Sequence, residues 1–388
     1  MENPVYARMA SELARLKASG NLRALPVAES RPRHVVFEGR ELLNLSSNDY
    51  LGLAADLSLR EAFFATLSPA TFLPTASSSR LLTGNSAACI QLEETLRRLY
   101  GAEAALVFGS GYHANTGILP AIADRDAEIF ADKLVHASLV DGIRLAQARH
   151  ARFRHNDVAD LRRLLAESSE RNPKGARIVV TESLFSMDGD AADLRALVSL
   201  KREFPNVLLY VDEAHAVGVR GPTGLGLAEE AGTLADVDFL VGTFGKALAS
   251  TGAFAVMSGL ARDWLVNTMR TLIFTTALPP VNLNWTNFIL ERLASFADRR
   301  ERLRGYGAAI AAAVRARGCD CPSVSQIVPW IIGSSMDAAA RAQQLRAAGY
   351  YVLPVRPPTV PEGTSRIRFS LTAALTPEEV TSLAAAIH

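Results

Sequence analysis

The chain has 388 residues, of which 49% are hydrophobic, and a formal net charge of +1 at pH 7. This length favours two packed domains, because a single hydrophobic core rarely grows beyond about 250–300 residues. A nearly neutral charge argues against nucleic acid as a partner, since proteins that neutralise phosphates carry a basic surface. No run of about 18 apolar residues is present and no signal peptide is visible, so we expect a cytoplasmic protein that does not span a membrane.

The three cysteines do not form a metal or redox motif. Cys319 and Cys321 are separated by one residue, and Cys89 lies far from both in the sequence. This spacing fits neither a zinc site nor a Cys-x-x-Cys pair. We therefore expect ordinary thiols and no metal site.

The first two thirds of the chain alternate between helical and strand-like patterns. A helix is predicted over residues 5–18, before the Gly20-Asn21 stop signal. The predicted strands are 104–108, 127–130, 176–181, 206–211, 237–241 and 253–257. The runs at 178–180 and 207–211 are continuously apolar, as in strands that are covered on both faces. This pattern predicts a mainly parallel sheet with helices on both sides.

The last third of the chain has the pattern of a smaller α+β domain. A long helix is predicted over 285–317, a helix over 336–348 and a helix over 377–387, with strands at 325–332, 351–355 and 366–371. We therefore expect three parts: an N-terminal helix and arm over 1–47, a large domain over 48–280 and a small domain over 281–388.

Two motifs follow predicted buried strands directly. Lys246 comes after the strand 237–241, where an amine is costly unless it is paired or used covalently. Asp212 ends the strand 206–211, and His215 follows three residues later. Ligand sites of open α/β sheets lie outside the carboxyl ends of strands. A carboxylate there could bind a metal ion, a ribose hydroxyl or a protonated ring nitrogen, and a structural turn cap remains an alternative.

Two further segments suit an anion and a flat ring. Gly109-Ser110-Gly111 lies between a predicted strand and a helix start, where backbone amides and the helix dipole favour a phosphate. Ala114 in the third position of this motif leaves a nicotinamide site open, although a clear acidic partner about 20 residues further on is missing. His136 follows the strand 127–130, where an imidazole could stack on an aromatic cofactor or cap a helix.

Seven segments in order resemble the α-oxoamine synthases, a branch of the fold-type-I enzymes that use pyridoxal 5'-phosphate (PLP). They are Asn44–Leu53, Ser110–Asn115, His136–Ser138, Glu182–Gly189, Val211–His215, Thr243–Lys246 and Phe274–Pro279. The resemblance spans about residues 45–375, nearly the whole chain. It implies a seven-stranded, mainly parallel central sheet and a homodimer with active sites at the interface.

The resemblance also implies a role for each matching residue. Lys246 would be the Schiff-base lysine, Asp212 the partner of the pyridine nitrogen and His136 the stacking imidazole. The phenolic oxygen of PLP would contact His215 and Ser186. The phosphate would bind to Gly111, Tyr112 and Thr243, and to Thr276 of the second subunit. Arg368 would pair with the amino-acid carboxylate, a task that suits a planar guanidinium, and Asn48 and Arg23 would contact the substrates.

The tail segments 356–361 and 363–369 are similar to the biotin-pathway branch of that family. This branch implies a decarboxylative condensation of L-alanine with a pimeloyl thioester of coenzyme A or acyl carrier protein, giving 8-amino-7-oxononanoate. The alternatives are a glycine C-acetyltransferase, a long-acyl aminoketone synthase, a non-enzymatic PLP-fold module and a nicotinamide-dependent oxidoreductase. The chain departs from the family pattern at Pro74–Arg80, which is commonly glycine-rich, and at Cys89, where a histidine is common.

Overall fold

The structure is a computed structural model that describes residues 3–388. The chain forms two compact units. Unit 1 comprises the residues up to Ala55, Met187–Asp190 and Arg302–His388, and unit 2 comprises Asp56–Ser186 and Ala191–Glu301. The sequence suggested three parts with boundaries at residues 48 and 281. These boundaries differ from those of the two units, and the three-part division stays a prediction.

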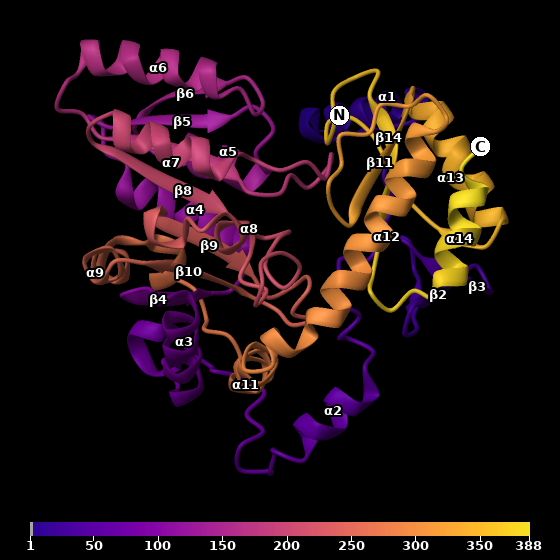
Figure 1. Cartoon of the computed structure of the whole chain (residues 1–388), viewed down its shortest axis with the longest axis horizontal. Helices are drawn as coiled ribbons and strands as arrows, with labels where there is room; N and C mark the ends of the chain where they lie inside the picture. Colours follow the sequence, from indigo (N-terminus) through magenta and orange to yellow (C-terminus); the bar gives the residue numbers. More distant parts are fainter. Residues whose placement is uncertain (1–2) are drawn as a thin grey trace. The chain divides into compact units, whose positions relative to one another are not determined.

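Unit 2 is built on a seven-stranded sheet with the strand order β4-β10-β9-β8-β7-β5-β6 (Figure 1). The strands are β4 (Ala104–Phe108), β5 (Glu128–Asp132), β6 (Arg149–Phe153), β7 (Arg177–Glu182), β8 (Val207–Asp212), β9 (Phe239–Thr243) and β10 (Ala253–Met257). Strands β5 to β9 pair in parallel, whereas β10 pairs antiparallel with both β4 and β9. The predicted mainly parallel sheet is confirmed.

The pattern of apolar residues predicted six strands and missed β6. Its sequence, Arg-His-Ala-Arg-Phe, is mostly polar, and only Phe153 is buried. Because β6 lies at the edge of the sheet, its side chains meet solvent and leave no apolar run. The resemblance to a known family, and not the pattern of apolar residues, predicted the seventh strand.

Helices cover both faces of the sheet. Alternate strand residues such as Ile178, Val180 and Val241 form one core with α4 (Gly111–Ile122), α5 (Ala137–Leu145) and α9 (Gly259–Thr268). The intervening residues, such as Val179 and Leu209, are equally buried. Helices α6 (Val158–Arg171) and α7 (Leu194–Glu203) contact the strands β5, β6 and β8. This double cover explains the continuous apolar runs of the central strands.

The parallel pairing aligns the carboxyl ends of the central strands. Glu182 at the end of β7 pairs in register with Asp212 at the end of β8, and Asp212 pairs with Val241 of β9. The segments that follow these strands therefore emerge at one edge of the sheet. Ligands of open α/β sheets bind at this edge.

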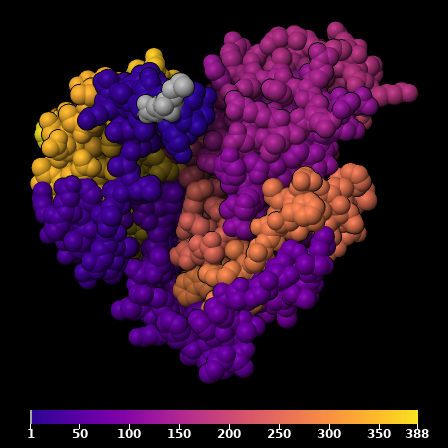
Figure 2. Space-filling view, turned by 180° about the vertical axis from the view of Figure 1, so that it is seen from behind, coloured from indigo at the N-terminus to yellow at the C-terminus, as the bar shows by residue number. Residues whose placement is uncertain are grey.

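Unit 1 contains two small sheets, with strand orders β1-β2-β3-β12 and β11-β14-β13. The strands are β1 (Glu29–Ser30), β2 (His34–Phe37), β3 (Arg40–Asn44), β11 (Ile327–Gly333), β12 (Tyr350–Tyr351), β13 (Pro354–Val355) and β14 (Ser365–Ser370). Its helices are α1 (Pro4–Ala18), α13 (Ser335–Ala347) and α14 (Pro377–Ala386). The N-terminal and C-terminal segments of this unit form one mass (Figure 2), because β3 pairs with β12 and Arg33 binds Glu379.

The single long helix predicted over 285–317 is wrong. The chain forms α11 (Pro280–Leu290), a short 3-10 turn over Leu293–Phe296 and α12 (Ala297–Arg315). Helix α11 begins at Pro280, as proline favours the first helical position. The buried Arg300 guanidinium donates to the carbonyls of Leu293 and Ala294, which the helical break exposes. A buried guanidinium thus compensates for lost helical hydrogen bonds, a pairing that periodicity cannot reveal.

The remaining helices of unit 2 are α2 (Leu57–Phe64), α3 (Ala87–Tyr100), the short α8 (Leu227–Ala231) and α10 (Arg270–Ile273). No helix within residues 3–388 is long and apolar enough to cross a membrane. The same residues contain no group of three or more histidine, cysteine, aspartate or glutamate side chains that could hold a metal ion.

Candidate active site

Asp212 is held at the carboxyl end of β8 by two donors. Its side chain is 5% exposed, its Oδ1 accepts from the Ala214 amide at 2.9 Å, and its Oδ2 accepts from Asn115 Nδ2 at 2.8 Å. Two hydrogen bonds stabilise the carboxylate and fix its orientation. Asp212 can therefore serve as a buried anion at the sheet edge.

His136 is the N-terminal capping residue of α5, and its side chain is exposed. Its Nδ1 lies 2.8 Å from the Ser138 hydroxyl and accepts from the Ser138 amide at 3.2 Å. Partial desolvation of the ring lowers the pKa of His136, with the charge of Lys246 acting in the same direction, whereas the charge of Asp212 opposes the shift. The imidazole is thus an exposed ring whose inner edge is held in place.

Lys246 lies three residues beyond the end of β9 and is half-buried. Its charge lowers the pKa of both His136 and Glu182, and the charge of Asp212 raises the pKa of the same two groups. Lys246 and Asp212 therefore both lie near His136 and Glu182. Thr243 ends β9, where its hydroxyl donates to the Gly252 carbonyl at 3.1 Å and accepts from the Gly245 amide at 3.3 Å. The hydroxyl thus braces the turn that leads to the lysine.

Glu182 is a second buried carboxyl group beside Asp212, and the reasoning from sequence did not single it out. The side chain is 2% exposed, and its Oε1 has no hydrogen-bond partner among the described residues. Burial raises the pKa of Glu182 well above its ordinary value, and Asp212 raises it further. Glu182 therefore retains its proton next to the Asp212 carboxylate. Its position just beyond the continuous apolar run 178–180 was the available sequence signal.

The glycine-rich segment forms an open helix N-terminus, as expected. Gly111 is the first residue of α4, and a Cβ added there would meet nothing within 4 Å. Ser110 caps the helix by accepting from the His113 amide at 3.1 Å. Tyr112 is exposed and its hydroxyl donates to Asp141. Backbone amides at the start of a 12-residue helix suit a phosphate group.

His215 and Ser186 both lie at the same edge of the sheet. His215 follows β8 and is 5% exposed, and Ser186 follows β7 and is 9% exposed. Both side chains are therefore placed by the strands that end in Asp212 and Glu182. This position is compatible with contacts to one ligand at the sheet edge, and the roles expected for them stay predictions.

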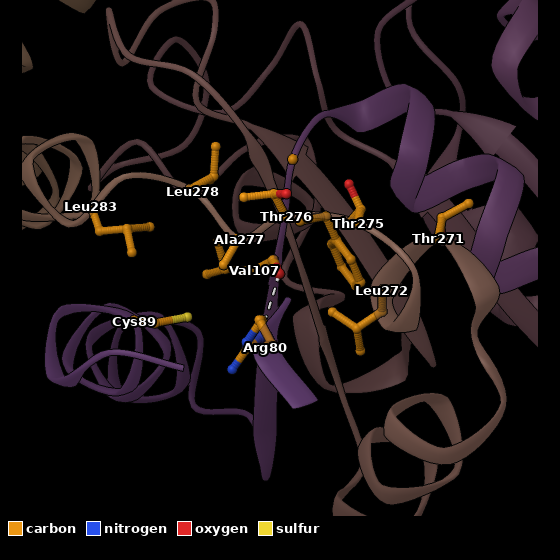
Figure 3. Close-up of a pocket in the computed structure, with 12 residues that line it drawn as sticks. Arg80, Cys89, Val107, Thr271, Leu272, Thr275, Thr276, Ala277, Leu278 and Leu283 are labelled. Carbon is orange, nitrogen blue, oxygen red and sulfur yellow. Dashed lines mark hydrogen bonds between the residues drawn. The ribbon is translucent and has the colours of Figure 1, made fainter. Parts of the chain in front are cut away.

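Thr276 belongs to a different part of unit 2. It lines a pocket together with Arg80, Cys89 and Leu278 (Figure 3), and it forms an isolated β-bridge with Ser79. Arg80 is clamped by Glu93 and also donates to the Val107 carbonyl. Thr276 itself is exposed. Its expected contact with the cofactor phosphate of a second subunit stays a prediction.

Cys89, one of the two departures from the family pattern, is a packing residue of α3. Its side chain is 2% exposed, and burial together with the nearby Glu93 raises the pKa of its thiol to about 12. A thiol that is neutral at physiological pH is a poor nucleophile. The pocket in Figure 3 is thus lined by an inert sulfur at this position.

Unit 1 brings two of the three expected substrate residues together. Tyr50 donates to Asn48 Oδ1 at 3.0 Å and accepts from Arg368 Nη2 at 3.4 Å. Burial raises the pKa of Tyr50, although the charge of Arg368 opposes this shift. The reasoning from sequence did not single out Tyr50, which connects Asn48 to the arginine.

Arg23, the third expected substrate residue, lies elsewhere in unit 1. It donates to the Thr359 hydroxyl at 2.9 Å, and Arg356 donates to the Gly20 carbonyl. Burial and the charge of Arg23 lower the pKa of Arg356, so the two guanidiniums repel each other. Within residues 3–388, neither arginine has an acidic side chain within 4 Å. Two neighbouring cations without an acidic partner form a candidate anion site.

The fold and the carboxyl-edge site are those of an aminotransferase-like enzyme, and comparison with known proteins supports this class. The family model for aminotransferase class I and II matches residues 40–387. The chain therefore belongs to the aminotransferase class I and II family.

Within this family, the similar proteins are α-oxoamine synthases, which confirms the resemblance seen in the sequence. An 8-amino-7-oxononanoate synthase from Chlorobaculum parvum is 50% identical over 390 residues, covering 99% of each chain. A serine palmitoyltransferase from S. paucimobilis, solved with a bound PLP–myriocin aldimine, has a TM-score of 0.90 and 30% identity, covering 100% of this chain and 98% of the other. An 8-amino-7-oxononanoate synthase from Francisella tularensis has a TM-score of 0.76 and 26% identity, covering 89% and 96%.

Proposed function

We propose that the chain is a PLP-dependent acyltransferase that condenses L-alanine with a pimeloyl thioester to form 8-amino-7-oxononanoate, carbon dioxide and the free thiol carrier. The observation that most strongly supports this function is the grouping of Asp212, His136 and Lys246 at the carboxyl edge of the sheet. The 50% identity to an 8-amino-7-oxononanoate synthase over nearly the whole length supports the choice within the family.

The residues of unit 2 fit PLP in charge and in shape. The buried Asp212 carboxylate suits a protonated ring nitrogen, and the open amides at Gly111 suit a phosphate. When bound, PLP supplies an electron sink for the bonding electrons released at the substrate carbon. Asp212 keeps the ring nitrogen protonated, and the exposed His136 ring provides a flat surface against which the cofactor can stack.

Lys246 has two tasks in this proposal. Its amine would hold the cofactor covalently before alanine binds, and afterwards it would serve as the base for the proton on the alanine Cα. His215 and Ser186 donate hydrogen bonds toward the phenolic oxygen of the cofactor. Tyr112 and Thr243, with Thr276 of a second subunit, complete the phosphate site around Gly111. The homodimer implied by this last contact is part of the proposal.

The arginines of unit 1 support the substrate assignment. We assign Arg368, with its neighbours Tyr50 and Asn48, to the alanine carboxylate, because a guanidinium binds a carboxylate through two parallel hydrogen bonds. Arg23 and Arg356 suit the free carboxylate at the far end of a pimeloyl chain. An acetyl or a palmitoyl thioester has no such carboxylate and would gain nothing from this pair.

The decisive experiment compares three substrate pairs on the purified protein supplied with PLP. Thiol release is followed with pimeloyl-coenzyme A and L-alanine, with acetyl-coenzyme A and glycine, and with palmitoyl-coenzyme A and L-serine. We expect release with the first pair, and a product with the mass of 8-amino-7-oxononanoate. Release only with the second or third pair would retain the enzyme class and overturn the substrate assignment.

A palmitoyl thioester as the acyl donor is the second candidate, since the serine palmitoyltransferase gives a higher TM-score than the 8-amino-7-oxononanoate synthase from Francisella tularensis. The same assay separates it from the pimeloyl activity. Lys246→Ala should abolish turnover with every pair, together with the visible absorption of the lysine-bound cofactor. The matched control, Lys174→Ala on an exposed turn, should retain both.

We expect Arg23→Ala to lower kcat/KM for pimeloyl-coenzyme A by about 10- to 100-fold, the range for losing a hydrogen bond to a charged group. Any activity with acetyl-coenzyme A should stay unchanged, because that thioester lacks the distal carboxylate. Arg31→Ala, which removes an exposed arginine paired with Glu29, is the control. An equal loss with both thioesters would contradict the assignment of Arg23.

A further inference from the structure

A chain of buried hydrogen bonds connects Asp212 to His136 through residues that have no role in the proposed chemistry. Tyr210 donates to Asn115 Oδ1 at 2.7 Å. Asn115 Nδ2 donates to Asp212 Oδ2 at 2.8 Å and to Ser138 Oγ at 2.9 Å. The Ser138 hydroxyl lies 2.8 Å from His136 Nδ1. The three linking side chains, of Tyr210, Asn115 and Ser138, are at most 1% exposed.

The donors and acceptors of this chain can be arranged in only one satisfactory way. Burial and the charge of Asp212 raise the pKa of Tyr210 well above its ordinary value, so the phenol keeps its proton and donates it to Asn115. The Asn115 oxygen is thereby occupied, and its two amide protons go to Asp212 and Ser138. The opposite orientation of the amide would place its oxygen against the Asp212 carboxylate, with no proton between them.

The amide and the hydroxyl of Ser138 determine the position of the proton on His136, and Asn115 binds the hydroxyl. The Ser138 hydroxyl oxygen accepts from Asn115 and lies 2.8 Å from His136 Nδ1. The Ser138 amide points at the same nitrogen, at 3.2 Å. An amide donor on Nδ1 requires a lone pair there, so the neutral ring carries its proton on Nε2 and the Ser138 hydroxyl donates to Nδ1.

We propose that Asn115 is a positioning residue that fixes the Asp212 carboxylate and, by donating to the Ser138 hydroxyl, orients the hydroxyl proton toward His136 Nδ1. The side-chain amide of Asn115 on α4 thereby contacts Asp212, the proposed partner of the ring nitrogen, directly, and His136, the proposed stacking imidazole, through Ser138. The consequences for the cofactor rest on the function proposed above, whereas the tautomer of His136 depends only on the geometry of unit 2. Helices α4 and α5, which carry Asn115 and Ser138, pack against each other.

The tautomer is measured first, by two-dimensional nitrogen-15 NMR of the full chain labelled at histidine and without PLP. The His136 signals are assigned by their loss in His136→Asn. We expect an unprotonated Nδ1 and a protonated Nε2 in the wild type. A wild-type protein with its His136 proton on Nδ1 would overturn the proposal directly.

Variants then test whether Asn115 acts through Ser138. Asn115→Ala should shift the His136 Nδ1 resonance, because the Ser138 hydroxyl loses the donor that orients its proton toward Nδ1. In a Ser138→Ala background the same substitution should cause no further shift. Thr116→Val, at a neighbouring α4 residue whose hydroxyl donates to the Tyr112 carbonyl, is the control and should leave His136 unchanged. An effect of Asn115→Ala that persists without Ser138 would refute the relay.

The Asp212 side is tested by the affinity for PLP, measured by its absorbance in equilibrium titrations. Asn115→Ala should weaken PLP binding at least about tenfold, since Asp212 loses a hydrogen bond to its charged group. Ser138→Ala should change the affinity by no more than about twofold. Equal losses in both variants would overturn the role at Asp212. A wild-type protein that binds no PLP would refute the proposed function but leave the tautomer experiment intact.

Should Asn115→Ala fail to fold, Tyr210→Phe and Ser138→Ala complete the test. Tyr210→Phe removes the donor that orients the Asn115 amide and should shift His136 Nδ1 in the same direction by a smaller amount. If neither of these variants shifts that resonance, the proposal is wrong.

Discussion

At the scale of single residues, the buried carboxyl groups behave differently from one another although they are near neighbours. Asp212 accepts a side-chain and a backbone hydrogen bond, whereas Glu182 leaves one oxygen unpaired and keeps its proton. Glu213 is fully buried and accepts from the Ser183 hydroxyl and from the amides of Leu227 and Ala228. The environment of each carboxyl group, and not its residue type, decides its charge.

Glu213 should make the stability of the protein depend on pH. Burial raises the pKa of Glu213 from its ordinary 4.5 to about 7, so the folded state holds a proton that the unfolded state has lost between these pH values. Its contribution is therefore fully present below pH 4.5 and is lost as the pH rises to about 7. The expected loss is about 3 kcal/mol.

Urea unfolding of the wild type and of Glu213→Gln across this pH range measures the effect. The difference in unfolding free energy, wild type minus variant, should fall by this amount as the pH rises. Glu167→Gln, at an exposed residue, should show no such trend. A difference for Glu213→Gln that is independent of pH would contradict the shifted pKa.

At the scale of elements, the junction of α6 with β7 depends on one arginine. Arg177, at the start of β7, is fully buried and donates to the side chain and carbonyl of Ser168 and to the carbonyls of Asn172, Gly175 and Pro205. These acceptors belong to the end of α6, the turn after it and the segment before β8. The guanidinium thus satisfies carbonyls that the ends of these elements leave unpaired.

We expect Arg177→Met to lower the free energy of unfolding by about 3–5 kcal/mol, because it leaves several buried carbonyls without a donor. Arg162→Met, which breaks an exposed ion pair with Glu203 on neighbouring helices, should cost less than about 1 kcal/mol. Chemical denaturation of the three proteins provides the comparison. Similar losses in both variants would show that the carbonyl contacts of Arg177 add little.

At the scale of the whole molecule, four residues in the middle of the chain belong to unit 1 although their neighbours in sequence belong to unit 2. In this segment, Met187–Asp190, the side chain of Asp188 pairs with Arg366, and the Gly189 carbonyl accepts from the Val324 amide at 3.0 Å. Gly189 has a φ of +68°, and a Cβ added to it would lie 1.9 Å from the Ile327 carbonyl oxygen. Only glycine fits this position without a shift of the backbone.

Gly189→Ala should therefore be far more destabilising than a glycine substitution that strains only the backbone. Gly101 is the matched control, since its φ is +61° and an added Cβ meets nothing within 4 Å. We expect about 1–2 kcal/mol for Gly101→Ala, from the left-handed conformation alone. Gly189→Ala should lose about 2 kcal/mol more through overpacking. Equal losses in thermal and denaturant unfolding would contradict the tight contact at Ile327.

Much of the large unit could be predicted from the sequence because its central strands are covered on both faces. Continuous apolar runs marked β7 and β8, and the polar residues Asp212 at the end of β8 and Lys246 after β9 marked the site. The polar edge strand β6 left no such signal, and the break between α11 and α12 depends on the distant contacts of Arg300. Local patterns report burial, and they fail where solvent or a remote side chain decides the structure.

The sequence by itself determined the parallel sheet, the family and the placement of Lys246, Asp212 and His136 after their strands, because these features depend on residues near one another in the chain. Only the tertiary structure decided that Asn115, 97 positions from Asp212, donates to that carboxylate. It also placed Glu182, whose Oε1 has no hydrogen-bond partner among the described residues, beside Asp212, and Tyr50 between Asn48 and Arg368. Hydrogen-bond partners and shifted pKa values depend on groups that folding brings together, and no local pattern records them.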